Sequence, residues 1–468
     1  MAQSHSRTYL FEQKPIPKAV AELSIPMVIT SLVMVVYNLA DTFFVGMLGD
    51  PVQNAAVTLV YPVMLAFNAV NNLFGIGTSS LMSREMGRGN YEKVRISSAF
   101  GFYGAMFSGL AFALCCTVFQ EPLLRLLGAD AETWDTTADY MLWVVCCGAM
   151  PAILNVVQGQ MTRAEGAALH ASIGTMSGCI LNIFLDPIFI LPWGLGMGAA
   201  GAGLATFISN CAACFYFLVL ARVKKGNTLV CMDIRKLKSL TRDVVEGVLI
   251  VGIPASIQNL LNVTGSTILN NFTAGYGASA VAAMGVSNKI NNLPVQICLG
   301  FSQGIMPLVS YNYASGNHRR MKHAIAFGAG IIVPVMATVS VVYWLGAPWF
   351  IALFMENPEI IAYGTRFLRG LCLGISFLCI DFLAVGVFAS LGMGKYALLF
   401  ALLRKVVLEI PLLFVLNHFF PLYGIAYAQF LTEVVLTVAA VIMLIRIFRQ
   451  CNGTTAIGTT TAQNREAL

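Results

Sequence analysis

Long apolar stretches are the feature of this sequence that most restricts how it can fold. Stretches of about 20 mostly apolar residues recur through the 468-residue chain, with short polar connections between them. Each is long enough to cross roughly 30 Å of hydrocarbon as a helix. Only helices and closed barrels satisfy their backbone polar groups in a bilayer, and runs this long are not strands. We therefore expect an all-α integral membrane protein.

The composition indicates that lipid is the main solvent of the chain. Apolar residues make up 57% and charged residues 11%, whereas a soluble domain carries about 25% charged residues. The net charge of +6 comes from bases in short loops, so no nucleic-acid partner is expected. Most of the twelve cysteines lie inside apolar runs, where a thiol acts as a small hydrophobic group. We expect no cofactor.

Basic residues predict the orientation in the membrane. They gather at Arg84 to Arg95, at Arg222 to Arg242 and at Arg319 to Lys322. The alternate loops are acidic, with Arg125 as the one clear base. Because loops rich in Lys and Arg stay in the cytoplasm, both termini are expected to be cytoplasmic.

The apolar stretches predict twelve transmembrane helices. These begin near Leu23, Val57, Ser97, Thr136, Ala167, Ala199, Val248, Val281, Lys322, Ala362, Ala397 and Gly424. The longest connection, from Lys224 to Arg242, divides them six and six. The predicted units are a cytoplasmic N-terminal segment (1–22), an N-lobe (23–222), an inter-lobe loop (223–245), a C-lobe (246–448) and a cytoplasmic tail (449–468).

The two halves repeat one another. A shift of about 227 residues places Ala55, Ala56, Gly77, Gly89, Asn90, Ala99 and Phe100 on Ala282, Ala283, Gly304, Gly316, Asn317, Ala326 and Phe327. Each half has an even number of spans, so both halves enter and leave the membrane on the same face. We therefore predict two homologous six-helix lobes with a cleft between them.

Acids inside the predicted spans indicate where function lies. They are Asp41, Asp186, Asp381, Glu409 and Glu433. An acid at the centre of a membrane helix costs about 2.5 to 3.5 kcal/mol, so most must face a cavity or a partner. Asp41 and Asp186 each lie about 18 residues into an outward-running helix and therefore share a depth in the outer half of the first lobe. Thr206, early in the next helix, lies at that depth too.

Polar side chains share a helix face with these two acids. Tyr37 and Asn38 come four and three residues before Asp41, and Asn182 comes four before Asp186. Such a group could bind Na⁺, with Asp41, Asp186 and Asn182 as oxygen ligands. It could instead hold a proton, because burial and mutual repulsion disfavour two charges at one site. The residues alone do not distinguish these ions, and a purely structural role stays open.

The second lobe has a different pattern of charges. Asp381 aligns with Asn155 across the repeat, and no acid occurs between Ile253 and Gly277 in the first helix of this lobe. Lys405 lies one turn before Glu409, which leaves both an internal ion pair and a functional role open.

Glu433 is open to either substrate contact or structural pairing. The predicted substrate-binding residues are Asn38, Asn155, Gln158, Asp381 and Glu433.

Five short segments carry a resemblance to a known family. They are Ile25-Pro26, Asp41 to Gly49 (DTFFVGMLG), the Gln160, Arg163 and Gly166 pattern, Leu181 to Pro187 (LNIFLDP) and Gly201 to Thr206 (GAGLAT). With them, nearly the whole chain resembles the multidrug and toxic compound extrusion (MATE) transporters, and within these the bacterial MepA-like branch. The resemblance implies a multi-pass protein of the bacterial inner membrane.

The resemblance also implies a mechanism. Two six-helix lobes form a V that alternates between inward-open and outward-open states and exports amphipathic organic cations against Na⁺ or H⁺. Cation coupling is placed on Asp41, Asn182, Asp186 and Thr206, with Tyr37 beside them. NorM-like relatives also use an acid on helix 7, which this chain lacks, so a second-lobe ion site built on Asp381 is in doubt.

These observations favour a cation-coupled efflux antiporter that works as a monomer in the lipid bilayer. The alternative is a lipid-linked or metabolite flippase of the same superfamily, for which several arginines in the cavity would be expected to grip phosphates. Here the intramembrane bases are few, chiefly Lys289, Arg404 and Lys405. An enzyme is not expected, because the five histidines are scattered and lie near loops.

Overall fold

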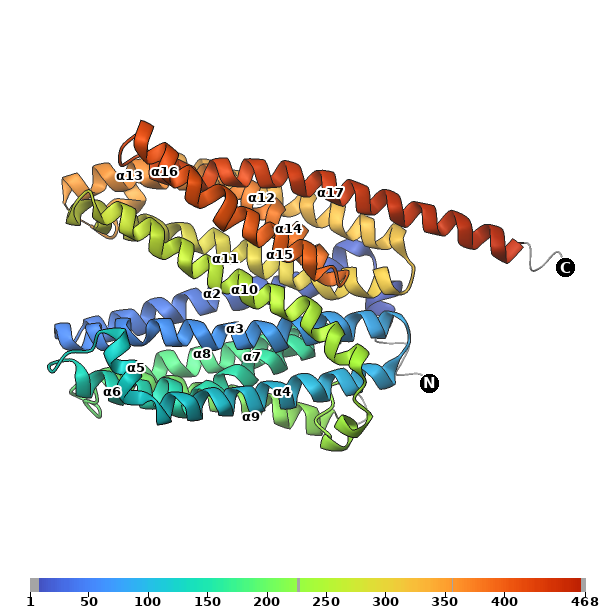
Figure 1. Ribbon diagram of the computed structural model, residues 1–468, viewed down its shortest axis with the longest axis horizontal. Helices are drawn as coiled ribbons and strands as arrows, with labels where there is room; N and C mark the ends of the chain where they lie inside the picture. Colours follow the sequence, from blue (N-terminus) through green and yellow to red (C-terminus); the bar gives the residue numbers. More distant parts are fainter. Residues whose placement is uncertain (1–7, 225–227, 356, 464–468) are drawn as a thin grey trace.

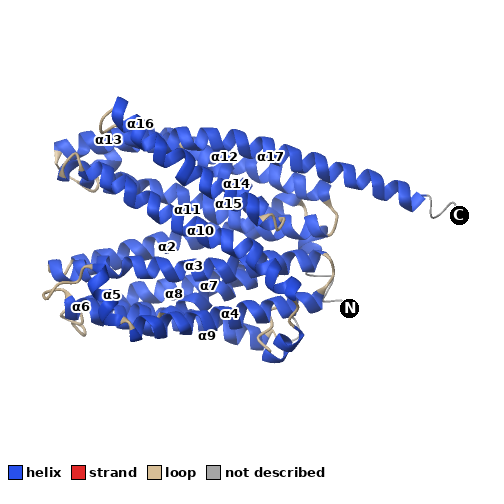
Figure 2. Ribbon diagram, in the orientation of Figure 1, coloured by secondary structure: helices blue, strands red, loops and turns tan. Residues whose placement is uncertain are grey.

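The computed structural model describes residues 8–224, 228–355 and 357–463 of the chain. Within these ranges the chain forms helices and no strands (Figure 2). The prediction of an all-helical protein is confirmed.

Each half of the chain runs back and forth as long helices. The first half contains α2 (Ile16–Gly46), α3 (Pro51–Gly87), α4 (Tyr91–Val118), α5 (Gln120–Leu127), α6 (Trp134–Met141), η1 (Leu142–Cys147), α7 (Ala149–Ala164), α8 (Ala168–Ile190) and α9 (Ala199–Val223). The connection contains η2 (Ile234–Ser239). The second half contains α10 (Arg242–Ala274), α11 (Ala278–Ala314), α12 (His318–Ala352), α13 (Pro358–Leu373), α14 (Ile375–Ser390), α15 (Gly394–Leu402), η3 (Leu403–Glu409), α16 (Ile410–Phe419) and α17 (Gly424–Gln463).

The predicted spans all correspond to these helices. Among the described residues, nine single helices are long and apolar enough to cross a membrane, and two bent helix pairs raise the number to eleven. The remaining predicted span, which begins near Ala397, is formed by α15, η3 and α16 in succession. The π-helical turn η3 divides it, so it is not one long α-helix.

The bent pairs occupy the same place in both halves. The helix of α6 and η1 meets α7 at 43°, and α13 meets α14 at 42°. Each pair is the fourth span of its half, so the internal repeat extends to this bend. The bends fall at Gly148 and Gly374.

Two groups of helices, α2–α9 and α10–α17, lie side by side (Figure 1). Both termini and the η2 connection lie at one end, which we call the terminal end; α5, α6, α13 and α16 mark the opposite, distal end. The groups converge toward the terminal end and spread apart toward the distal end (Figure 1).

Apolar packing agrees with this V shape. One large core contains residues from both lobes, including Phe74 and Phe301. Two smaller cores each belong to a single lobe near the distal end, one containing Val45 and the other Phe367. The lobes therefore share buried apolar surface at the terminal end and have separate cores at the distal end.

Glycines let the backbones of the two lobes meet. Gly77 of α3 lies against the carbonyl of Val248 in α10, and Gly304 of α11 lies against Ser24 in α2. Neither position has room for a Cβ atom. Small residues of this kind permit close helix approach in membranes.

Two predicted boundaries differ from the structure. Helix α2 begins at Ile16, directly after Pro15, and not near Leu23; helix α17 continues past 448 to Gln463. A helix keeps its backbone hydrogen bonds in water as well as in lipid, so it need not end where the apolar stretch ends.

Candidate functional site

Three helices of the N-lobe bring the predicted cation-coupling residues together. Tyr37 and Asp41 come from α2, Asn182 and Asp186 from α8, and Thr206 from α9. Helix α8 packs against both α2 and α9. Asp41 and Asp186 lie near the ends of their helices and Thr206 near the start of α9, which places all of them in the distal half. The structure thus places these residues at one level of the N-lobe.

Close packing of α8 on α9 fixes the amide and hydroxyl groups of this site. Gly178 of α8 lies against Ala213 and the carbonyl of Ser209 in α9, so the two helices approach closely here. One turn toward the distal end, Asn182 Nδ2 donates to Thr206 Oγ1 at 3.3 Å. The hydroxyl of Tyr37 also reaches the Thr206 side chain.

A second pair of amides extends this network. Asn210 Nδ2 donates to the carbonyl of Thr206 at 3.0 Å, and Asn155 Nδ2 donates to Asn210 Oδ1 at 3.2 Å. Oδ1 of Asn155 and Oδ1 of Asn182 are buried and accept no hydrogen bond from the described residues. The site thus presents several unused oxygen acceptors.

The two carboxylates have no counter-charge among the residues that the structure describes. Asp186 is fully buried and Asp41 is half-buried. They lie close enough to repel one another electrostatically. Among the described residues neither forms an ion pair, and both oxygens of Asp186 and Oδ1 of Asp41 lack a hydrogen-bond partner. Burying an ionised carboxylate without a partner is energetically costly.

A small cavity lies among the amide and hydroxyl groups, about one helical turn from the carboxylates; neither Asp41 nor Asp186 lines it. It has a volume of about 40 Å³, enough for one or two water molecules. Its lining residues are Tyr37, Asn155, Thr175, Gly178, Cys179, Asn182, Thr206, Ser209 and Asn210. Within the described parts of the chain no three His, Cys, Asp or Glu side chains form a metal cluster. Carboxylate, amide and hydroxyl oxygens of the kind found in and next to this cavity suit a hard cation such as Na⁺.

Asn38, one turn before Asp41 on α2, also belongs to a stripe of residues that runs along the side of α2 facing the C-lobe. Ser24, Ser31 and Asn38 are spaced seven residues apart, so they form one stripe along the helix. Ser24 and Ser31 contact Gly304 and Gly300 of α11 in the C-lobe, whereas Asn38 is exposed. Asn38 thus continues the C-lobe-facing stripe into the region where the lobes have separated.

Gln158 lies apart from Asn155, another predicted substrate-binding residue of α7. It is buried and lines a separate cavity with Thr162 of α7, Phe217 of α9 and Thr228 of the inter-lobe connection. Asn155, in contrast, lines the cavity beside Tyr37 and Asn182. The structure thus separates two residues that lie one turn apart in sequence.

The C-lobe acids are paired with bases. Arg404 of η3 forms ion pairs with Asp381 of α14 and Glu433 of α17, the latter at 3.1 Å between Nε and Oε1. All three side chains are buried. Lys405 Nζ lies 2.7 Å from Glu409 Oε2, which confirms the internal ion pair as one of the two roles left open for Glu409. The bridge made by Arg404 was not foreseen.

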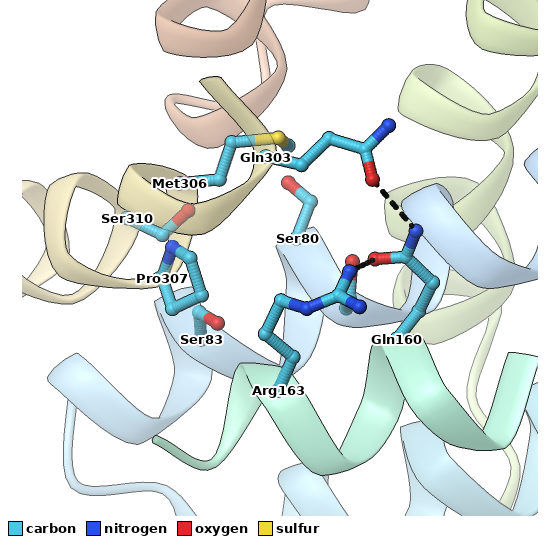
Figure 3. A pocket seen from close by; sticks show the side chains of 9 residues that line it. Ser80, Ser83, Gln160, Arg163, Gln303, Met306, Pro307 and Ser310 are labelled. Atoms are coloured by element: carbon cyan, nitrogen blue, oxygen red, sulfur yellow. Dashed lines mark hydrogen bonds between the residues drawn. The ribbon is translucent and has the colours of Figure 1, made fainter. Parts of the chain in front are cut away.

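A buried arginine at the terminal end was also missed as a site residue. Arg163 of α7 is 4% exposed, and its Nη1 donates to Gln160 Oε1 at 2.9 Å. Gln160 Nε2 in turn donates across the lobes to Gln303 Oε1 of α11 at 3.2 Å (Figure 3). The sequence signal was the Gln160, Arg163 pattern, whose spacing of three places both side chains on one face of α7.

Comparison with known proteins follows the same two-lobed division. The family model described as MatE matches residues 26–188 and 254–415, once in each half. The multidrug export protein MepA of Staphylococcus saprophyticus is 32% identical over 436 residues, covering 93% of this chain and 95% of that protein. MepA of Staphylococcus aureus strain MRSA252 is 32% identical over 441 residues, with the same coverage.

Solved structures agree over almost the whole chain. A MATE protein in complex with MaL6 superposes with a TM-score of 0.90 at 25% identity, covering 95% of this chain and 99% of that one. An outward-facing multidrug resistance MATE transporter superposes with a TM-score of 0.89 at 25% identity, covering 95% and 98%. The chain therefore belongs to the MatE family, a family of membrane transporters and not of enzymes.

Proposed function

We propose that this protein is a multidrug exporter that moves amphipathic organic cations out of a bacterial cell in exchange for H⁺ or Na⁺. Relatives that match 93% of the chain are multidrug export proteins, which supports drug export as its activity. The observation that carries the coupling proposal is the unpaired Asp41 and Asp186 pair, because its charge must be balanced by a mobile cation.

The proposed orientation places the terminal end in the cytoplasm. Lys93, Arg95, Lys236 and Lys238 lie at that end, in agreement with the distribution of basic residues on the cytoplasmic side of membrane proteins. The lobes are then closed toward the cytoplasm and separated toward the outside. Superposition on an outward-facing relative supports this assignment.

The proposed cycle begins with an ion that enters from outside. Its binding neutralises or screens Asp41 and Asp186, changes the packing of α2 and lowers the affinity of the N-lobe for drug. Asn38, which faces the space between the lobes, contacts the drug in the outward-open state. For the ion to drive this cycle it must bind the two states unequally, since equal binding shifts no population.

The test is dye efflux from proteoliposomes that carry an imposed Na⁺ or pH gradient. Wild type should expel an ethidium-like dye under the gradient of its coupling ion, and Asp41→Asn and Asp186→Asn should lose this gradient-driven efflux. Asp130→Asn, which changes an exposed distal acid outside the site, is the matched control and should transport normally. Unchanged efflux in both site variants would refute the coupling site, and applying each gradient separately identifies the ion.

A further inference from the structure

The residues that precede α2 form a small structural element of their own. Residues 8–12 are helical, and Pro15 separates them from α2. Leu10 is 8% exposed and Phe11 is fully buried, although the surrounding sequence is polar. This segment, residues 8–14, lies at the terminal end, where the lobes converge.

The apolar side of the segment lies between the two lobes. The Phe11 ring stacks on Tyr311 of α11 with centroids 4.9 Å apart and planes inclined by 15°. On the other side, Leu10 and Phe11 lie against Gly166, in the turn between α7 and α8 of the N-lobe. Gly166 has a φ of +88°, and a Cβ there would lie about 3.0 Å from the Phe11 ring. Phe11 therefore packs against both lobes at once.

Side chains of the C-lobe bind the backbone carbonyls of the segment. Arg320, near the start of α12, donates from Nε to the carbonyl of Phe11 at 2.5 Å and from Nη2 to the carbonyl of Lys14 at 2.5 Å. Asn312 Nδ2 also donates to the Phe11 carbonyl, at 3.1 Å. These donors satisfy carbonyls that the end of a short helix leaves without partners. Arg320 and Asn312 thus bind the backbone of the segment, and the packing of Phe11 fixes where that backbone lies.

Because the segment is covalently continuous with α2, its contacts with the C-lobe link the two lobes. The segment continues directly into α2, where Lys14 also forms an ion pair with Glu22. Helix α2 belongs to the N-lobe, while Arg320 and Asn312 belong to the C-lobe. Separation of the lobes at the terminal end must therefore break the Arg320 contacts or pull Phe11 from its site.

We propose that residues 8–14 are a latch that holds the terminal end closed and sets how often the lobes open there. The latch acts together with the Gln160–Gln303 bridge between the same lobes. As a control on opening toward the cytoplasm, it rests on the alternating-access function proposed above. The latch consists of the buried Phe11 ring and of backbone carbonyls that accept hydrogen bonds from the Arg320 guanidinium.

The experiment measures the distance between the lobes at the terminal end. Pairs of spin labels are attached through an unnatural ketone-bearing amino acid at Tyr91 of α4 and Lys395 of α15, both exposed, so that the native cysteines stay intact. Phe11→Ala and Arg320→Gln should each add a longer-distance population, raising the open fraction about tenfold over wild type. Tyr9→Ala changes an exposed aromatic side chain in the same short helix and should leave the distribution unchanged.

Two results would overturn the latch. One is a wild-type distance distribution in both Phe11→Ala and Arg320→Gln; the other is an equal shift in Tyr9→Ala. Arg320→Gln keeps the apolar packing intact, so it tests the latch even if Phe11→Ala does not fold. The distances are measured without drug or ion gradient. Failure of dye transport would therefore refute the proposed function and leave the latch result standing.

Discussion

The N-lobe and the C-lobe each bury a group of acids, but they balance the charge in opposite ways. In the N-lobe, Asp41 and Asp186 face amides and hydroxyls, and no described base pairs with them. In the C-lobe, Arg404 forms ion pairs with both Asp381 and Glu433. The acids of one lobe thus have no cationic partner among the described residues, and those of the other are balanced by an arginine side chain.

This difference shows why two homologous halves need not contribute equally to coupling. A carboxylate site can exchange ions only if the cation that balances its charge can leave. Arg404 is covalently attached and also lies over the ring of Phe382, 4.6 Å from its centroid. We therefore expect the C-lobe cluster to stabilise the fold and the N-lobe cluster to respond to ions.

The largest expected effect comes from removing the attached cation. Arg404→Met leaves Asp381 and Glu433 buried without a partner, which should cost about 3 to 5 kcal/mol of stability. The measurement is the thermal midpoint in detergent, followed by fluorescence-detected size-exclusion chromatography. Lys289→Met, which changes an exposed base of α11, is the control. An unchanged midpoint for Arg404→Met would mean that the C-lobe cluster does not need its arginine.

The next effect is stabilisation by the coupling ion. A ligand that binds only the folded state at 100 times its Kd stabilises by about 2.7 kcal/mol. Titration with Na⁺ at fixed pH, and with acid at fixed Na⁺, should raise the thermal midpoint of wild type for the ion that the N-lobe binds. The shift should vanish in Asp186→Asn. A shift that persists in that variant would place the ion elsewhere.

A smaller effect on stability should distinguish the two lobes in the absence of any coupling ion. Asp381→Asn removes one acid from Arg404 and should destabilise the protein by about 1 to 3 kcal/mol. Asp186→Asn removes an acid that has no partner, so its thermal midpoint should stay the same or rise. Both changes preserve side-chain shape and can be compared in one melting series. Equal destabilisation by the two variants would contradict the contrast between the lobes.

The smallest effect concerns the hydroxyl that orients Asn182. Thr206→Val preserves shape but removes the bond from Asn182 Nδ2, which should cost about 0.5 to 1.5 kcal/mol and weaken ion-dependent stabilisation severalfold. Thr117→Val, where the hydroxyl donates to the carbonyl of Ala113 in its own helix and lies outside the site, is the control. If both variants keep the full ion response, Thr206 has no part in the site.

The features of the fold and site that could be predicted from the sequence depend on the number of residues along a single helix. Span lengths follow from the thickness of the bilayer, and the shared depth of Asp41 and Asp186 follows from the rise per residue. Tyr37 and Asn182 were placed beside these acids by helical periodicity. Periodicity did not predict that Gln158 and Asn155 line different cavities, because neighbours on one helix can face different helices.

The features that sequence analysis missed depend on contacts between distant segments. Arg404, Asp381 and Glu433 come from three separate elements, and nothing local indicates which acid the arginine meets. Phe11 lies in a polar segment that was predicted only as a cytoplasmic N-terminal segment. Its burial depends on Tyr311 and Gly166, which form two walls of its site.

The equivalent bends of 43° and 42° carry a historical consequence. If one ancestral six-helix gene was doubled and fused, a bend present in both descendants belongs to the ancestor, whereas the mismatch between Asp186 in one lobe and the Arg404 bridge in the other arose later. The scaffold of this molecule is then older than its asymmetry.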